Sequence, residues 1–441
     1  MLLEFRASNY KSFKDEFVFS LTPTAKQKGL DYSVMKTVID KKEYTGLSSA
    51  VIYGPNAAGK TNIIGAMDTF KTIILRGDIR NVSDANEPNT AIRMLEFIPN
   101  NKMSVTLPVG FSTTFIEDEF LVEYALSIDI GRFLEHEYRR IILSETLKVN
   151  SELVFVRNGD LKFGPFNVIQ NFLVNAFAEN AAGAFALAKA NLNDEELFLM
   201  NGFKTMFSSK LVALITDWLE KKFMVSSRTN SAYLIRKIST PREKSIYVEK
   251  TLNEAVDCFG IKANALGSVL GRDTDGVTLY SQFRNGSEKN KTIPAELFES
   301  HGTIRFVNMF PLMANALANG GTLVIDDADT PIHPMVLMNI VNILHNNDIN
   351  INHAQLVFIT HNPIFLNANL FRRDEIMFVE RDEKSHLSTL YSLADFDNIG
   401  RTSAGQGEDY MKNYLAGRYG AIKDIDFAPI FERIADSGHY M

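Results

Sequence analysis

Residues 54–61 have the sequence Gly-Pro-Asn-Ala-Ala-Gly-Lys-Thr, which fits the phosphate-loop pattern G-x-x-x-x-G-K-[ST]. Glycines let a backbone wrap round a phosphate, and main-chain amides at a helix N-terminus bind its negative charge. Lys60 would reach the β- and γ-phosphates of a nucleotide, and the Thr61 hydroxyl would hold Mg²⁺. We therefore expect ATP and Mg²⁺ to bind here. The expected nucleotide-binding residues of this loop are Gly54, Asn56, Ala57, Ala58, Gly59, Lys60, Thr61 and Asn62.

The segments on either side of the loop have the character that a phosphate loop requires. Residues 49–53 form a short, apolar, β-branched run typical of a buried strand, and residues 62–70 have helical spacing. The alternative is a glycine-rich turn that only resembles the loop. The strand–loop–helix context and a second motif downstream favour the phosphate loop.

The second motif is an apolar strand that ends in two carboxylates. Residues 320–327 have the sequence Gly-Gly-Thr-Leu-Val-Ile-Asp-Asp, and the carboxyl ends of parallel strands are where open α/β sheets bind ligands. We expect Asp326 to lie on the Mg²⁺ side and Asp327 to orient or deprotonate an attacking water. Alone, the pattern would equally fit a strand followed by a solvated acidic turn that includes Asp329.

A third apolar strand, at residues 355–359, is followed by Thr-His-Asn-Pro. A histidine at the end of a neighbouring strand can donate a hydrogen bond to a γ-phosphate, so His361 is a candidate catalytic residue. The alternative is a surface histidine without a role in chemistry. Its place at a strand end, like the other two motifs, favours the catalytic interpretation.

A weaker motif, Ser300-His-Gly302-Thr, precedes a helical run that extends to about residue 318. Ser300 and Gly302 lie where a helix begins, so this N-terminus could also bind an anion. We include both in the nucleotide-binding set. Alone, the motif would indicate only the start of a helix.

The order of these motifs resembles that of the ABC-type ATPases. Taken together, the motifs resemble those of the AAA-15 family, whose members are prokaryotic, ABC-like relatives of the RecF, SMC and OLD-family proteins. Four further segments match that group: an opening strand and turn, an "E-x-L" strand, the residues after the Asp strand, and a C-terminal motif. They are residues 3–13, 142–147, 326–334 and 414–422.

The resemblance implies an α/β fold, an ABC-type P-loop ATPase head that hydrolyses ATP and associates at least as a head-to-head dimer. In such enzymes the signature serine of one subunit, here Ser300, touches the γ-phosphate bound by the other. Where the family carries Glu, this chain has Asp327. Its arm is one methylene shorter, and a misplacement of about an ångström can cost about a hundredfold in rate. We therefore expect slow hydrolysis.

Composition indicates an ordinary soluble globular protein. The 441 residues carry a formal net charge of −7, so the surface as a whole is not a nucleic-acid binder. The single cysteine, Cys258, rules out an intrachain disulfide. We find no transmembrane segment and no secretory leader, and therefore expect a cytoplasmic location and no membrane partner.

The chain changes character twice. Residues 1–164 are β-rich and contain the phosphate loop, residues 165–262 have helical periodicity, and strands return from 263 to 441 with the remaining motifs. We predict an ATPase head that is discontinuous in sequence, with a β-rich N-terminal subdomain and a helical insertion. The resemblance does not extend over the insertion, where basic residues between Arg228 and Lys244 leave DNA or RNA contact open.

Three functions fit these observations. Too little chain follows the last motif for a Toprim nuclease, so the first is an ATPase that regulates a separately encoded nuclease or toxin in anti-phage defence (abortive infection). This role comes from the family resemblance. The second is a RecF-like DNA-repair ATPase. The third is a scaffold that binds ATP without hydrolysing it.

Overall fold

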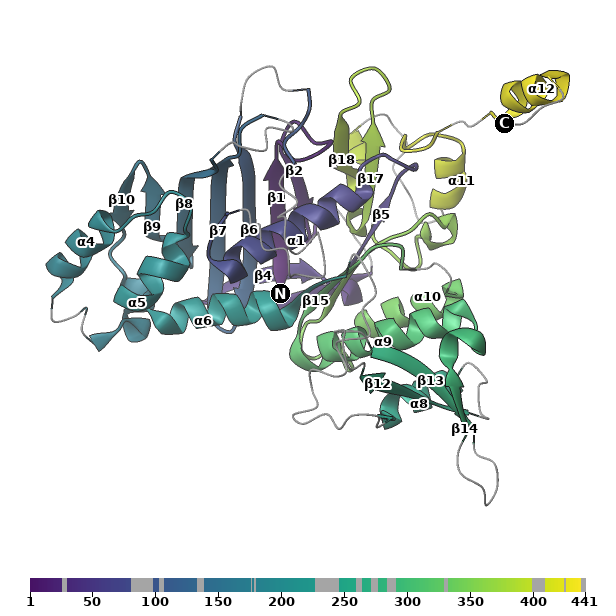
Figure 1. Cartoon of the computed structure of the whole chain (residues 1–441), viewed down its shortest axis with the longest axis horizontal. Helices are drawn as coiled ribbons and strands as arrows, with labels where there is room; N and C mark the ends of the chain where they lie inside the picture. Colours follow the sequence, from purple (N-terminus) through teal and green to yellow (C-terminus); the bar gives the residue numbers. More distant parts are fainter. Residues whose placement is uncertain are drawn as a thin grey trace.

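Two large sheets organise the molecule (Figure 1). The computed structural model describes residues 1–25, 30–80, 98–102, 107–132, 139–175, 177, 180–226, 246–258, 264–270, 277–283, 291–328, 332–398, 409–423 and 426–437. Within them, one sheet is mainly parallel and carries the sequence motifs at one edge. The other is antiparallel. The fold is α/β.

The parallel sheet has the strand order β11-β15-β16-β5-β17-β18. Its first five strands run parallel, and only β18 is antiparallel to its neighbour. Because β5 comes from the first part of the chain and β15 to β18 from the last, the sheet is discontinuous in sequence, as predicted. The bounds are β5 Ser49–Tyr53, β11 Phe223–Ser226, β15 Thr322–Ile325, β16 Gln355–Ile359, β17 Ile376–Arg381 and β18 Ser388–Ser392.

Burial explains why these strands could be recognised. Every residue of β5, β15 and β16 is buried, as expected for strands covered on both faces. Since parallel strands end at the same edge, the phosphate loop after β5, the carboxylates after β15 and the histidine after β16 meet there. Strand β16 lies between β5 and β15.

The antiparallel sheet has the order β10-β9-β8-β7-β6-β1-β2. Strands β9 and β10 form a hairpin with its turn at Asn158-Gly159, where Gly159 has a φ of 67°. A separate two-stranded sheet pairs β3 with β4. The bounds are β1 Leu2–Ser8, β2 Phe17–Ser20, β3 Val34–Ile39, β4 Lys42–Leu47, β6 Val109–Glu117, β7 Phe120–Asp129, β8 Ile141–Val149, β9 Glu152–Asn158 and β10 Asp160–Phe163.

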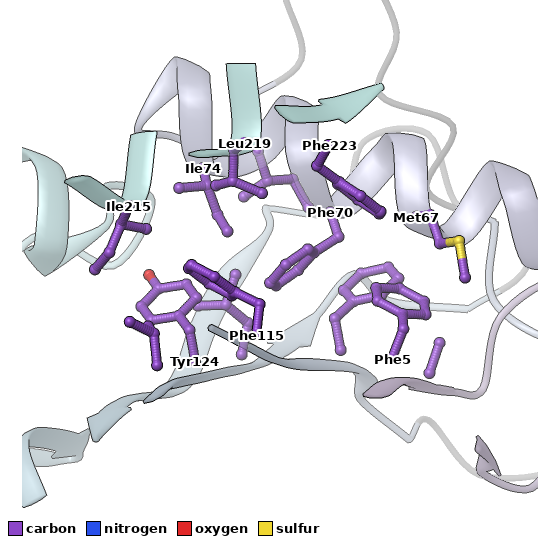
Figure 2. Close-up of a cluster of buried hydrophobic side chains, with 14 of the residues drawn as sticks. Phe5, Met67, Phe70, Ile74, Phe115, Tyr124, Ile215, Leu219 and Phe223 are labelled. Atoms are coloured by element: carbon purple, nitrogen blue, oxygen red, sulfur yellow. The ribbon is translucent and has the colours of Figure 1, made fainter. Parts of the chain in front are cut away.

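Helix α1 (Lys60–Arg76) follows the phosphate loop and joins the two sheets in one core. Figure 2 shows Met67, Phe70 and Ile74 of α1 directed toward Phe5 and other side chains of the antiparallel sheet. The rings of Phe5 and Phe70 are 5.7 Å apart and meet edge to face. The phosphate loop is thus fixed at both ends, by a buried strand and by a buried helix.

The opposite face of the parallel sheet is covered by α9 (His301–Asn319) and α10 (Pro334–Leu344). Beyond them a three-stranded sheet and α8 (Lys250–Asp257) form an outer layer (Figure 1). Strands β13 and β14 pair antiparallel. The sheet consists of β12 Asn264–Leu270, β13 Val277–Phe283 and β14 Lys291–Pro294.

Helices dominate the described part of residues 165–226, but one strand, β11, lies within the segment predicted to be helical. It pairs with β15, so this segment also completes the parallel sheet. The domain boundaries themselves stay predictions. The helices here are α4 Ala181–Ala190, α5 Lys204–Met206 and α6 Ser209–Asp217, with π-helical turns at Leu199–Phe203 and Trp218–Lys222. Near the C-terminus lie α11 Tyr410–Leu415 and α12 Ala428–Ser437.

Candidate nucleotide-binding site

Both glycines of the loop are required by the space around them. A Cβ on Gly54 would lie 2.3 Å from the main-chain oxygen of Val379 in β17. Gly59 has a φ of 112°, and a Cβ there would lie 2.6 Å from the Ser388 hydroxyl and 2.7 Å from the Ser12 hydroxyl. The backbone can therefore follow this tight path only where the side chain is absent.

The Lys60 ammonium group lies inside the loop. It donates hydrogen bonds to the main-chain oxygens of Gly54, at 2.7 Å, and Pro55, at 3.0 Å. Burial lowers the pKa of Lys60 to about 8, while the carboxylates of Asp327 and Asp326 act in the opposite direction. A buried cation with only carbonyl partners is ready to pair with an anionic ligand.

Thr61 and Asp326, from the phosphate loop and the Asp strand, are direct neighbours. Both side chains line the same cavity. Burial raises the pKa of Asp326, and the nearby Thr61 hydroxyl partly offsets this effect. A hydroxyl and a carboxylate side by side are the oxygen ligands that Mg²⁺ prefers, so this pair fits the expected ion.

Asp327 and His361 face each other at the mouth of the site. The distance between His361 Nε2 and Asp327 Oδ1 is 3.8 Å, and both side chains are about half exposed. Asp327 has a φ of 48°, a left-handed conformation that Asp and Asn adopt more readily than other residues with side chains. An exposed carboxylate and an imidazole at this place can both reach a bound water or phosphate.

A cavity of about 540 Å³ brings most of the predicted residues together. Gly54 and Ala58 belong to the loop but do not line this cavity, because Gly54 faces Val379 and Ala58 is buried. The cavity is lined by Ser12, Asn56, Ala57, Gly59, Lys60, Thr61, Asn62, Asp326, Asp327, His361 and Arg381.

Ser300 and Gly302 are not among the residues that line this cavity. Ser300 is the N-cap of α9, and its hydroxyl accepts a hydrogen bond from the Thr303 amide at 3.1 Å. The same end of the helix contacts the Asp strand through Arg305, whose Nη2 donates to the main-chain oxygens of Asp326 and Asp327. The participation of Ser300 in a nucleotide site therefore stays a prediction.

Two cavity residues, Ser12 and Arg381, were not predicted as site residues. The Asn62 side-chain amide donates to the Ser12 hydroxyl at 2.7 Å, and Arg381 donates to the main-chain oxygen of Ala57 at 3.3 Å. Ser12 lies in the N-terminal segment that carries part of the family resemblance, which was a usable signal. Arg381 ends β17, the neighbour of β5, and this pairing is visible only in the folded sheet.

A parallel sheet with a phosphate loop after one strand and carboxylates after another defines a P-loop nucleotide-binding protein. The family described as "AAA domain, putative AbiEii toxin, Type IV TA system" matches residues 49–367, and the chain belongs to this family. The match covers the phosphate loop, the Asp strand and the His strand. The narrower AAA-15 assignment stays a prediction. No curated protein matches the sequence.

Among solved structures, the chain is similar to SMC head domains. The SMC head bound to the C-winged helix domain of ScpA has 10% identity and a TM-score of 0.39, over 89% of this chain and 97% of that chain. The SMC head domain from Thermotoga maritima has 13% identity and a TM-score of 0.36, over 89% and 98%. An Smc head with an extended coiled coil, bound to the C-terminal domain of ScpA from Pyrococcus furiosus, has 11% identity and a TM-score of 0.38, over 90% and 98%.

The described residues contain neither a membrane-spanning helix nor a cluster of metal-ligand side chains. No helix among them is long and apolar enough to cross a membrane. Within the same residues, no group of three or more His, Cys, Asp or Glu side chains has the arrangement of a metal site.

Proposed function

We propose that this chain is an ABC-type ATPase that binds ATP with Mg²⁺, hydrolyses it slowly and self-associates, and thereby regulates a separately encoded effector in anti-phage defence. The observation that carries the ATPase proposal is the convergence of Lys60, Thr61, Asp326, Asp327 and His361 on one cavity. These residues come from three strand ends that lie side by side in the parallel sheet.

Each of these side chains has a role that its surroundings support. Lys60 would exchange its hydrogen bonds to the carbonyls of Gly54 and Pro55 for hydrogen bonds to phosphate oxygens. This exchange is favourable because a hydrogen bond between two charged groups is stronger than one to a neutral carbonyl. Thr61 and Asp326 would hold Mg²⁺, which when bound neutralises charge on the transferring phosphate. Because both residues already line the same cavity, they could bind the ion without a rearrangement of the backbone.

Asp327 and His361 would act on the water and on the γ-phosphate. Asp327 would orient the attacking water and accept its proton at a carboxylate oxygen, and His361 would donate a hydrogen bond to the phosphate. Both side chains are about half exposed in the single chain. Hydrolysis of this kind depends on the orientation of the attacking water and on the exclusion of bulk water. Since the site is open in the single chain, we expect slow turnover there and faster turnover when another surface covers the site.

The covering surface that we propose is a second copy of the chain. Leu297 and Phe298, just before the Ser300 cap, are 75% and 54% exposed, and Ile364, just after the His strand, is 42% exposed. Exposed large apolar side chains just before α9 and just after the His strand support burial against a partner. Ser300 of one copy would then approach the phosphates held by the other.

The defence role rests on the family description, which names a toxin–antitoxin system. A switch with two ATP-dependent arrangements can regulate an effector that binds them unequally. The basic residues Arg228 to Lys244, on which the DNA-binding alternative depends, lie outside the described residues. A salt-dependent DNA-binding assay tests that alternative directly.

Expression in a phage-challenge assay tests the proposal. The chain is expressed alone, with its neighbouring gene, and with that gene as a Lys60→Ala variant. We expect protection only from the intact pair. Full protection by the chain alone, or growth arrest by the chain alone that requires Lys60, would show that the chain is itself the effector. Protection by the Lys60→Ala pair would contradict an ATP-dependent switch.

A further inference from the structure

Arg305 connects the N-terminus of α9 to the turn that carries both carboxylates of the site. It lies in the second turn of the helix that Ser300 caps. A single nitrogen, Nη2, donates to the main-chain oxygens of Asp326, at 2.8 Å, and Asp327, at 3.1 Å. One side chain therefore bridges two successive peptide groups at the point where β15 ends.

The turn is held in an unusual conformation at the bridged residues. Asp327 has a φ of 48°, which costs free energy for a residue with a side chain. On either side, the Asp326 amide donates to the Ser226 oxygen and the Ala328 amide donates to the Ile359 oxygen, both at 3.2 Å. Arg305 supplies the hydrogen bonds to the carbonyls between these two amides.

The arginine itself is placed at a cost. Its Nε is buried and has no hydrogen-bond partner within the part of the chain that the structure describes. Burial lowers the pKa of Arg305, against the opposing charges of Asp327 and Asp326. A buried nitrogen without a hydrogen bond costs free energy. The two hydrogen bonds of Arg305 to the turn are the interactions that can offset this cost.

We propose that Arg305 is a positioning residue that sets the conformation of the Asp326–Asp327 turn and transmits contacts at the N-terminus of α9 to the hydrolytic carboxylate. The link between α9 and turnover rests on the function proposed above. The start of α9 is also tied to the outer sheet, because the Ser281 hydroxyl of β13 donates to the Glu299 carboxylate at 2.7 Å. Pressure on this end of the helix, such as docking of a second copy at Ser300, would therefore move Arg305 and the turn together.

The first arm of the test is independent of ATP. Amide hydrogen exchange is measured in the nucleotide-free chain for wild type and Arg305→Met, which keeps an unbranched stem but removes the donors of the side chain. We expect the Asp326 and Ala328 amides to exchange about tenfold faster in the variant, while the Gly77 amide at the end of α1 is unchanged. Unchanged exchange at Asp326 and Ala328 would overturn the proposal.

The second arm compares binding with turnover. We expect Arg305→Met to keep ATP affinity within about twofold and to lose about tenfold to a hundredfold in kcat, because the lysine and the loop are untouched while Asp327 is misplaced. Arg305→Lys should recover most of the loss, since one ammonium group can donate to both carbonyls. If Arg305→Met lost ATP affinity and kcat equally, or if Arg305→Lys recovered no activity, Arg305 would not be a positioning residue.

Arg157→Met is a matched control, because Arg157 donates to the main-chain oxygens of Glu196 and Asn193 far from the cavity in the fold. This control should leave the amide exchange of Asp326 and Ala328 unchanged, and also the kcat. If Arg157→Met also accelerated this exchange and lowered kcat at unchanged ATP affinity, the proposal would be overturned. If Arg305→Met fails to fold, Arg305→Gln replaces it. A wild type that binds no ATP would refute the proposed function, while the exchange arm would still decide the role of Arg305 at the turn.

Discussion

Thr61 and Asp326 line the same cavity, and the Thr61 hydroxyl lowers the pKa of the Asp326 carboxyl, although the two residues come from distant parts of the chain. The two groups that would hold Mg²⁺ are thus near each other in the single chain. This proximity arises because β5 and β15 lie in one parallel sheet with only β16 between them. The folded sheet therefore prepares the cation site before a nucleotide arrives.

Replacement of Asp326 by Asn should remove the increase in ATP affinity that Mg²⁺ provides. The amide keeps the shape of the side chain but loses the negative charge that attracts the ion. We expect the ratio of ATP affinity with Mg²⁺ to affinity with a chelator to fall by at least about tenfold. Titration with a fluorescent ATP analogue measures this ratio. A ratio equal to that of wild type would remove Asp326 from the metal site.

Replacement of Asp327 by Asn should stop hydrolysis and leave ATP binding intact. Asn tolerates the positive φ of this position, so the turn should keep its conformation while the proton acceptor is lost. We expect a long-lived ATP-bound assembly, detected by size-exclusion chromatography with light scattering. Turnover equal to that of wild type would show that Asp327 is not the catalytic carboxylate.

Asp327→Glu tests the length of the arm. The longer side chain should raise turnover, at a stability cost of about 1 kcal/mol because Glu adopts a positive φ less readily than Asp. Turnover and thermal unfolding are measured on the same samples. A fast wild type that the Glu substitution slows would show that the turn is adapted to aspartate.

Ser300 should act on the site of a second copy. Ser300→Asp keeps an N-cap side chain, so α9 should remain folded, but it places a negative charge toward the partner's phosphates. We expect Ser300→Asp to lose turnover, and its mixture with Lys60→Ala to regain part of it, because each heterodimer then has one intact composite site. Ser300→Asn is the neutral control with the same capping ability. If heterodimers form and no activity returns at any mixing ratio, the contact in trans is excluded.

Nucleotide binding should take up a proton at alkaline pH. The pKa of Lys60 is lowered to about 8 in the free chain, and phosphate charges would raise it again. Below this pH the lysine is already charged, whereas above it affinity should fall by up to about tenfold per pH unit. Calorimetry in two buffers of different ionisation enthalpy detects the proton. Lys60→Arg, which stays charged, should show no such uptake, and equal uptake in both proteins would assign the proton to another group.

The strands and loops of the site could be predicted because their signals are local. A buried parallel strand is a continuous apolar run, so residues 49–53, 322–325 and 355–359 stand out, and the loop residues follow from a fixed spacing.

The features that could not be predicted depend on contacts between distant segments. Strand β11 is four residues long, and only its pairing with β15 makes it part of the sheet. Arg381 reaches the loop because β17 lies beside β5, and Arg305 reaches the main-chain oxygens of Asp326 and Asp327 because α9 packs across the sheet. His345 lies buried against Ser49 and Glu375, with Nε2 2.8 Å from the Ser49 hydroxyl, and this contact too joins distant segments.

The central claim is that this cavity binds ATP through Lys60, and isothermal titration of MgATP tests it most directly. Wild type is compared with Lys60→Ala and with Lys210→Ala, which removes an exposed lysine on α6 as a control. We predict equal binding by wild type and Lys210→Ala and no measurable binding by Lys60→Ala, because the substitution removes the cation that lies within the loop. Wild-type affinity in Lys60→Ala, or no binding by the wild type, would contradict the account.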